Sequence, residues 1–273
     1  MIRLPVVCSF ARSGGRWWRR VSFLTALVLA LPVTAGSTSG AATATLTTVT
    51  RTEALLLGDS VMNGMAQSYA AAARWQLAVR HSFVLDTAGC RRLITTSCHI
   101  GTGRTPTDAL TALVARAGQF QRVLVVGAGY NDTTNGPTGV GAAIDVLIAE
   151  AHRQGVEHVV WLTYREAGRS ATRYRAHNAV VRLKDIAYPE LTVADWATLS
   201  ATMPANWFSA DGIHLGAQAA EGMADLIADA IDLLPSPASE NSCPGVAARA
   251  AAAGVLAVGP VQRPRVWCRR YPV

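Results

Sequence analysis

Over most of the chain, short apolar runs alternate with longer stretches in which apolar residues recur at helical spacing. The short runs predict strands, and the spaced stretches predict amphipathic helices. The predicted strands are 54–57, one within 77–85, 123–126, 159–163 and 191–194. The predicted helices are 61–75, 107–117, 142–153, 173–185 and 217–233. Strands and helices therefore follow one another in regular alternation.

Strands that are apolar along their whole length are typical of a parallel sheet that is covered on both faces. The alternating helices supply those covers, because a crossover between parallel strands needs a helix-length connection. We therefore expect an α/β fold, a three-layer α/β/α sandwich around a parallel sheet of about five strands. In such sheets the ligand crevice lies beyond the carboxyl ends of the strands, so functional residues should follow strands.

The first 35 residues differ in composition from the rest. They contain five arginines and no acidic residue, then an uncharged run over 21–31 and the small residues of Val33-Thr34-Ala35. This order is that of a signal peptide, and the run is shorter than the ~20 residues that span a bilayer. We expect a cleaved signal peptide over 1–35, with an uncleaved anchor as the alternative. A flexible linker rich in Thr, Ser, Gly and Ala is expected over 36–50.

The composition limits the class of protein. Half of the residues are hydrophobic and 16% are charged, which suits one sizeable core and not a disordered chain. The net charge is +7, but the five arginines of the leader supply most of that excess. A nucleic-acid-binding protein carries its basic residues on the folded part, so no nucleic-acid partner is expected. We expect a monomeric domain over 51–234, with membrane contact only through the leader if it is uncleaved.

Residues 235–273 contain six prolines and predict an irregular tail. Four cysteines follow the leader as two local pairs, and an even number in an exported chain indicates disulfides. Of the three possible connectivities, short loops favour Cys90–Cys98 and Cys243–Cys268, the second of which would tie down the tail. Buried free thiols are the alternative. No metal site is predicted, because the sequence has no Cys-x-x-Cys pair and Cys98-His99 stands alone.

Polar residues gather first in Gly58-Asp59-Ser60, directly after the first predicted strand. This position places Ser60 at a helix N-terminus, whose unpaired N–H groups can stabilise an oxyanion. Taken by itself, however, a serine at such a position is better explained as a helix cap.

Two more polar clusters follow. Gly127-Ala128-Gly129-Tyr130-Asn131-Asp132 comes after the third strand, and the Asn131 amide can donate to a negative oxygen without losing a proton. Asp211-Gly212-Ile213-His214 combines a histidine base with a carboxylate that can fix its tautomer. Each cluster alone could be a turn. Together they supply a nucleophile, an oxyanion donor and an oriented base, so one site explains them better than three turns.

The three clusters, in this order, resemble the blocks of the GDSL/SGNH hydrolase superfamily, Gly-Asp-Ser, Gly-x-Asn-Asp and Asp-x-x-His. The likeness covers about 53–233. It is greatest to the SGNH domains of bacterial acyltransferases that modify envelope polysaccharides. The residues that carry this closer likeness are Gly58-Asp59-Ser60-Val61-Met62, Asp195-Trp196, and Trp207-Phe208 ahead of Asp211-Gly212-Ile213-His214-Leu215.

The resemblance implies a flavodoxin-like SGNH fold and a catalytic triad of Ser60, His214 and Asp211. It also implies an oxyanion hole made by the backbone N–H groups of Ser60 and Gly89 and by the side chain of Asn131. Gly89 matches the lone glycine of the family's second block.

Two aromatic residues near these clusters, Tyr130 and Trp207, are candidate substrate contacts. Core packing explains Trp207 equally well.

These residues predict an exported bacterial serine esterase, secreted or in the cell envelope, that deacylates carboxylic esters through an acyl-enzyme. No cofactor is expected. The substrate would be a small-molecule or glycan-linked ester, such as O-acyl groups on envelope glycans or lipids. One alternative is an O-acyltransferase that uses the same triad with a sugar hydroxyl as acceptor. Another is a non-catalytic cell-wall binding module.

Overall fold

The computed structural model describes residues 51–101 and 103–235. The predicted signal peptide, the linker and the Cys243–Cys268 pair lie outside these residues. Within them, five strands form one sheet in the order β2-β1-β3-β4-β5, and all neighbouring strands are parallel. The strands are β1 (Thr52–Gly58), β2 (Phe83–Thr87), β3 (Phe120–Gly127), β4 (His158–Leu162) and β5 (Leu191–Ala194). This strand order is flavodoxin-like.

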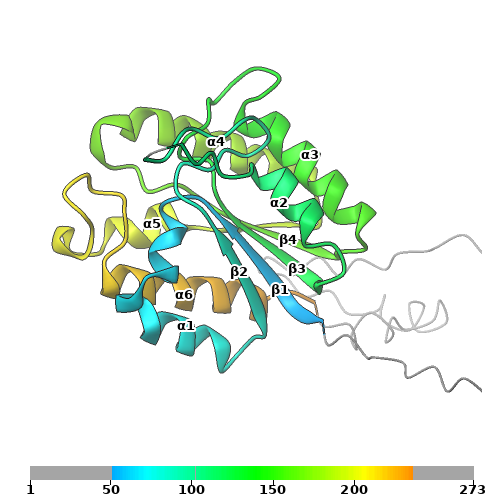
Figure 1. Cartoon of the computed structure of the whole chain (residues 1–273), viewed down its shortest axis with the longest axis horizontal. Coiled ribbons are helices and arrows are strands. Elements are labelled where there is room, and N and C mark those ends of the chain that lie inside the picture. The colour runs from blue at the N-terminus through cyan, green and yellow to red at the C-terminus, as the bar shows by residue number, and fades with distance from the viewer. Residues whose placement is uncertain (1–50, 102, 236–273) are drawn as a thin grey trace, which may run out of the picture. The chain divides into compact units, whose positions relative to one another are not determined.

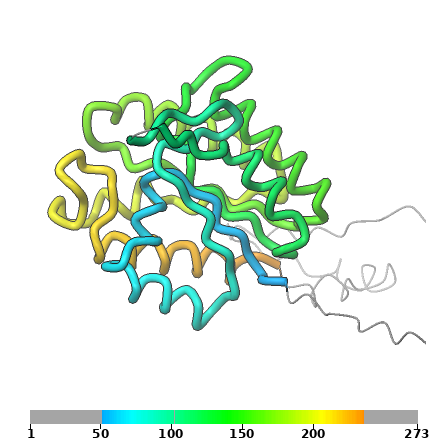
Figure 2. The backbone as a smooth tube through the Cα atoms, viewed as in Figure 1, coloured from blue at the N-terminus to red at the C-terminus, as the bar shows by residue number. Residues whose placement is uncertain are grey.

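Helices cover both faces of the sheet (Figure 1), and the path of the backbone through these layers can be followed in Figure 2. Helices α1 and α6 pack against each other on one face, and α2, α3 and α4 form the layer on the other. The α-helices of the described part are α1 (Ala71–Ala78), α2 (Ala109–Ala115), α3 (Val140–Arg153), α4 (Ala171–Ala187), α5 (Trp196–Ala201) and α6 (Ala217–Asp232). The predicted three-layer α/β/α sandwich with a parallel five-stranded sheet is confirmed. None of the described helices is long and apolar enough to cross a membrane.

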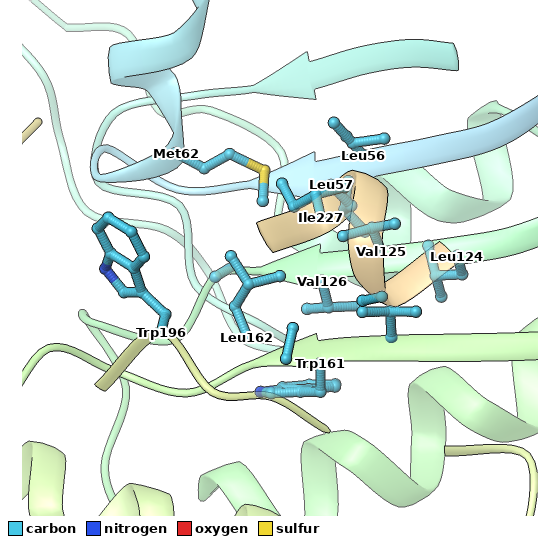
Figure 3. Packing of buried hydrophobic residues seen from close by; sticks show 14 of the residues in the cluster. Leu56, Leu57, Met62, Leu124, Val125, Val126, Trp161, Leu162, Trp196 and Ile227 are labelled. Atoms are coloured by element: carbon cyan, nitrogen blue, oxygen red, sulfur yellow. The ribbon is translucent and has the colours of Figure 1, made fainter. Parts of the chain in front are cut away.

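The core lies between the sheet and its helices because the central strands are apolar on both faces. Side chains of β1, β3 and β4 pack with Ile227 of α6 and with Trp196 (Figure 3). The register sets the ends of the strands level, since Gly58 of β1 aligns with Thr87 of β2 and with Gly127 of β3. The turns that follow these three strands therefore meet at one edge of the sheet, where the predicted site residues lie.

The Met62 side chain packs against the carboxyl ends of β1 and β3, where Gly58 and Gly127 have no side chain that would occupy its position. A Cβ on Gly58 would lie 2.5 Å from the Met62 side chain, and one on Gly127 would lie 2.2 Å from it. Any larger residue at either position would push Met62 outward. The turn after β1 is thereby packed against the end of β3.

The predicted helix over 61–75 is wrong up to residue 70 and confirmed only over 71–75, which belong to α1. The chain instead forms two 3₁₀ helices, η1 (Met62–Ala66) and η2 (Ser68–Ala70), before α1 begins at Ala71. Gln67 is extended, with φ −72° and ψ 157°, and separates them. A tertiary contact holds this segment, since Gly64 packs closely against Leu215, which precedes α6, and a Cβ on Gly64 would lie 2.8 Å from the Leu215 side chain. Apolar spacing over one or two turns does not distinguish a 3₁₀ helix from an α-helix.

Candidate active site

The turn after β1 and the loop before α6 bring Ser60 next to His214. The Ser60 Oγ lies 2.9 Å from His214 Nε2, and His214 Nδ1 lies 2.5 Å from Asp211 Oδ2. In the neutral tautomer with the proton on Nδ1, the imidazole donates to Asp211 and accepts from the Ser60 hydroxyl. The three residues of the predicted triad therefore form one continuous chain of hydrogen bonds.

The Asp211 carboxylate also shapes the loop that carries the histidine. Its Oδ1 accepts the backbone N–H groups of Ile213, at 3.0 Å, and of His214, at 3.2 Å. Gly212 has φ +77°, which lets the chain turn back toward the carboxylate. Partial burial by itself raises the pKa of Asp211, but these N–H groups and the histidine outweigh it and lower the pKa below its ordinary value. Asp211 is therefore a carboxylate at neutral pH and can orient His214.

Arg165 is hydrogen-bonded to the loop that carries Asp211 and His214. Its Nε donates to the carbonyl of Gly212 at 2.7 Å, and its Nη1 donates to the carbonyl of Ser200. The guanidinium lies 3.7 Å from the centroid of the Phe208 ring. No sequence motif points to Arg165, because it lies 46 positions before Asp211 and no local pattern connects the two.

Asp59 joins the turn after β1 to the turn after β3. Its side chain is fully buried. One carboxylate oxygen accepts from Val61 N at 2.9 Å, and the other accepts from Gly129 N at 3.0 Å and from Tyr130 N at 2.9 Å. Burial raises the pKa of Asp59 to about 6, although the three N–H groups act in the opposite direction. The motif had singled out Ser60, but the structure shows that Asp59 fixes the two turns that carry Ser60 and Asn131.

The predicted oxyanion donors lie in the turns after β1, β2 and β3. Asn131 lines the same cavity as Ser60 and His214. One hydrogen of its amide is donated to the carbonyl of Arg91 at 3.1 Å. An amide nitrogen carries two hydrogens, which leaves one for an oxyanion. Gly89 lies two residues beyond the end of β2 and outside the set of residues that line the cavity, so its role stays a prediction.

A buried arginine, to which no sequence motif points, connects the loop after β2 to the sheet. Arg91 is 3% exposed and donates to the carbonyls of Asp86, at 2.7 Å, and Gly58, at 3.3 Å. It also forms an ion pair with the Asp86 carboxylate at 2.8 Å. Arg91 therefore joins the carboxyl end of β2 to the carboxyl end of β1, two residues before Ser60.

A disulfide joins Cys90 to Cys98 in the same loop, with 5.3 Å between the Cα atoms. This pairing is one of the two that short loops favoured. Among the described residues that are not glycine, only Cys90 has a positive φ, of 60°. A left-handed conformation is unfavourable for a residue with a Cβ, so the loop must hold Cys90 in place. The disulfide lies next to Arg91, whose carbonyl accepts a hydrogen bond from the Asn131 amide.

Removing this disulfide is expected to lower both stability and activity. For the double variant Cys90→Ser, Cys98→Ser, the lost loop constraint predicts a fall of about 2.5 kcal/mol in the free energy of unfolding. We expect kcat on a short acyl ester to fall as well, because the carbonyl of Arg91 and the Asn131 amide lose their fixed positions. Urea unfolding and steady-state kinetics measure the two effects.

A matched variant separates the covalent constraint from the backbone strain. In Cys90→Gly, Cys98→Ser, glycine adopts a positive φ freely, so we expect about 1 kcal/mol more stability than in the double serine variant. Equal kcat in all three proteins would show that the loop does not position the site.

The cavity over Ser60 has a volume of about 330 Å³. Tyr130 lines it, and its hydroxyl accepts from Arg165 N at 2.8 Å, so its role as a substrate contact stays a prediction. Trp207 does not line this cavity and packs against the hydrophobic core. The sequence could not distinguish a substrate contact from core packing for Trp207, because both roles need an aromatic residue near the histidine. The described residues contain no cluster of three or more side chains suited to bind a metal.

Solved structures with a similar fold are known, although no similar curated sequence is found. No protein-family model matches the sequence, and no curated protein matches it. Solved structures do match. TesA shares 16% identity, with a TM-score of 0.51, over 66% of this chain and 97% of TesA.

Two further structures are esterases. The psychrotrophic esterase EstA from Pseudoalteromonas sp. shares 13% identity, with a TM-score of 0.50, over 66% of this chain and 96% of its own. The aryl esterase of M. smegmatis shares 10% identity, with a TM-score of 0.50, over 68% of this chain and 100% of its own. At identities this low, the similarity shows the fold alone, so the activity must be argued from the geometry of the site. The chain therefore shares the fold of these three structures, a three-layer sandwich around a parallel sheet.

Proposed function

We propose that this protein is a serine esterase that deacylates carboxylic esters with Ser60 as its nucleophile. The observation that carries the proposal is the continuous chain from Ser60 Oγ through His214 to Asp211 at the carboxyl edge of the sheet. Ligands of doubly wound sheets bind at this edge, and the site lies where the order of the strands reverses between β1 and β3.

Two steps complete the reaction. His214 Nε2 takes the hydroxyl proton as Ser60 Oγ attacks the ester carbonyl carbon, and the alcohol leaves with that proton. Water then attacks the acyl-enzyme, His214 takes a proton from it, and the acid is released as Ser60 Oγ regains a proton. In both steps the negative oxygen is held by the Asn131 amide and by the backbone N–H groups of Ser60 and Gly89.

Solvent access favours hydrolysis over transfer to a sugar. The His214 side chain is 38% exposed and that of Asp211 is 46% exposed, so water reaches the base directly. A transferase must exclude water from its acyl-enzyme. Product analysis with an acyl donor and an oligosaccharide distinguishes the two, because only transfer places the acyl group on the sugar.

We place the reaction outside the cytoplasm, as a proposal that rests on two observations. The basic leader with its short apolar run has the order of a signal peptide. The Cys90–Cys98 disulfide persists in an oxidising compartment and is rare in a reducing one. The esters of the cell envelope are therefore the substrates within reach.

A fluorophosphonate probe tests the proposal, because it phosphonylates only a serine that an adjacent base activates. We expect labelling of the peptide that contains Ser60, identified by mass spectrometry. We expect no labelling of folded Ser60→Ala and much slower labelling of His214→Gln. Labelling of a different serine, or none in a folded protein, would refute the assignment and favour a binding module.

A further inference from the structure

Two exposed arginines line the cavity that contains the catalytic residues. Arg169, in the 3₁₀ helix η3 (Gly168–Ser170), and Arg173, in the first turn of α4, line the 330 Å³ cavity together with Ser60 and His214. Arg173 donates to the carbonyl of Tyr130 at 3.0 Å and to Ser170 Oγ at 3.4 Å. Neither arginine forms an ion pair with a carboxylate among the described residues. Both therefore keep charge that a bound anion could neutralise.

The acidic groups of the site are already engaged. Asp211 lines the cavity, but His214 and two backbone N–H groups bind its oxygens. Asp59 and Asp132 are 0% and 2% exposed and accept backbone N–H groups inside the protein. Two arginines and one carboxylate line this cavity, so its lining is positive by one charge.

A second cavity, of about 670 Å³, adjoins the first at Ala167, which lines both. Three more arginines line it, Arg165, Arg175 and Arg182, with Glu166 as the single carboxylate among its lining residues. Glu166 pairs with Arg175 at 2.9 Å, and Asp195, outside the lining, pairs with Arg182 at 2.9 Å. These ion pairs neutralise Arg175 and Arg182, and Arg165 is bound to the carbonyls of Gly212 and Ser200. The exposed arginines of the two cavities that lack a carboxylate partner therefore lie beside Ser60, and the second cavity extends the space next to them.

Size and charge together select one kind of ligand. A small acyl group needs only a fraction of the first cavity, so most of the hollow surface is available to the alcohol part of the ester. Arginine binds carboxylates through two parallel hydrogen bonds, which suits ligands with carboxylates on a rigid frame. One carboxylate beside the ester would therefore meet the two arginines of the first cavity that have no carboxylate partner.

We propose that the substrate is an O-acylated glycan that carries carboxylate groups. Its acyl ester lies at Ser60, one carboxylate lies against Arg169 and Arg173, and the rest of the chain continues past Ala167 into the second cavity. This inference rests on the proposed esterase function and adds to it the chemical class of the alcohol part.

The test compares one polymer in two forms, O-acetylated polygalacturonate with free carboxylates and the same material after its carboxylates are converted to amides. Released acetate is measured, with 4-nitrophenyl acetate as a small neutral substrate. We expect kcat/KM about tenfold higher on the free acid, from one or two charge-assisted contacts, and a smaller difference at 0.5 M NaCl because salt screens exposed charges. The ratio of the two kcat/KM values should approach one in the double variant Arg169→Gln, Arg173→Gln.

Arg153→Gln is the matched control, because Arg153 is 63% exposed at the last turn of α3 and pairs only with Glu150 on its own helix. This control should keep the wild-type ratio. Equal rates on both polymers, or no acetate from the acidic polymer while 4-nitrophenyl acetate is hydrolysed, would overturn the inference and leave the esterase function standing. Loss of activity on all three substrates would instead remove the esterase function on which the inference depends.

Discussion

Replacing Ser60 with alanine should lower kcat on a short acyl ester by about 10⁶-fold and leave the protein folded. The Ser60 hydroxyl is the atom that attacks, and its bond to His214, at 2.9 Å, is the side-chain contact that the variant removes. The fold of the turn does not depend on that hydroxyl, because Asp59 holds the turn through Val61 N. We therefore expect an unchanged melting temperature together with nearly complete loss of 4-nitrophenyl acetate hydrolysis.

The other members of the triad should give a graded series. His214→Gln should be about as damaging as Ser60→Ala, whereas Asp211→Asn should cost about 10⁴-fold, because the histidine remains but its tautomer and orientation are no longer fixed. Ser82→Ala is the matched control, since Ser82 accepts from Glu53 N at 2.9 Å at the opposite edge of the sheet. More than a tenth of wild-type activity in Ser60→Ala would exclude Ser60 as the nucleophile.

Asp59→Asn is expected to destabilise the protein by about 2 kcal/mol and to lower kcat by at least tenfold. Both oxygens of Asp59 accept hydrogen bonds, from Val61 N on one side and from Gly129 N and Tyr130 N on the other. An asparagine can offer an oxygen to only one side, so its NH₂ group must face a buried N–H donor. The turns that carry Ser60 and Asn131 would then move apart.

Asp132→Asn provides the control for this prediction, because the two carboxyls are alike in environment but not in bonding. Burial raises the pKa of both Asp59 and Asp132 to about 6. Both oxygens of Asp132 accept from the same donor, Leu93 N, at 3.2 Å, so one amide oxygen can replace them. We expect less than about 1 kcal/mol of destabilisation by urea unfolding. Equal losses in the two variants would show that Asp59 is simply a buried acid and not the link between the turns.

The strands and most of the helices could be predicted from local patterns. The fifth strand, expected at 191–194, is β5 with the same bounds, and the last helix, expected at 217–233, is α6 (Ala217–Asp232). Continuous apolar runs must be buried on both faces, and this requirement also predicts the parallel sheet. Helix α5 was missed, although Asp195 caps it by accepting from Thr198 N, which is a signal that the sequence contains.

The sequence by itself determined which residues could do the chemistry. Ser60, Asn131, Asp211 and His214 stand in motifs whose residue types suit a nucleophile, an oxyanion donor, an orienting acid and a base. Each motif is local, so its members can be read from neighbouring positions. The tertiary structure then brought Ser60 and His214, which are 154 positions apart, to 2.9 Å.

Only the tertiary structure decided what holds and surrounds these residues. Arg91 lies 33 positions from the Gly58 carbonyl that it binds, and Asp59 lies 70 positions from Gly129. Neither link leaves a periodic pattern, because each joins the ends of strands that become neighbours only in the sheet. The arginine-lined cavities have the same origin, since their walls come from turns and helices that the parallel crossovers bring to one edge. A sequence carries the identity of each side chain, whereas the shape and charge of a cavity depend on which distant segments the fold places together.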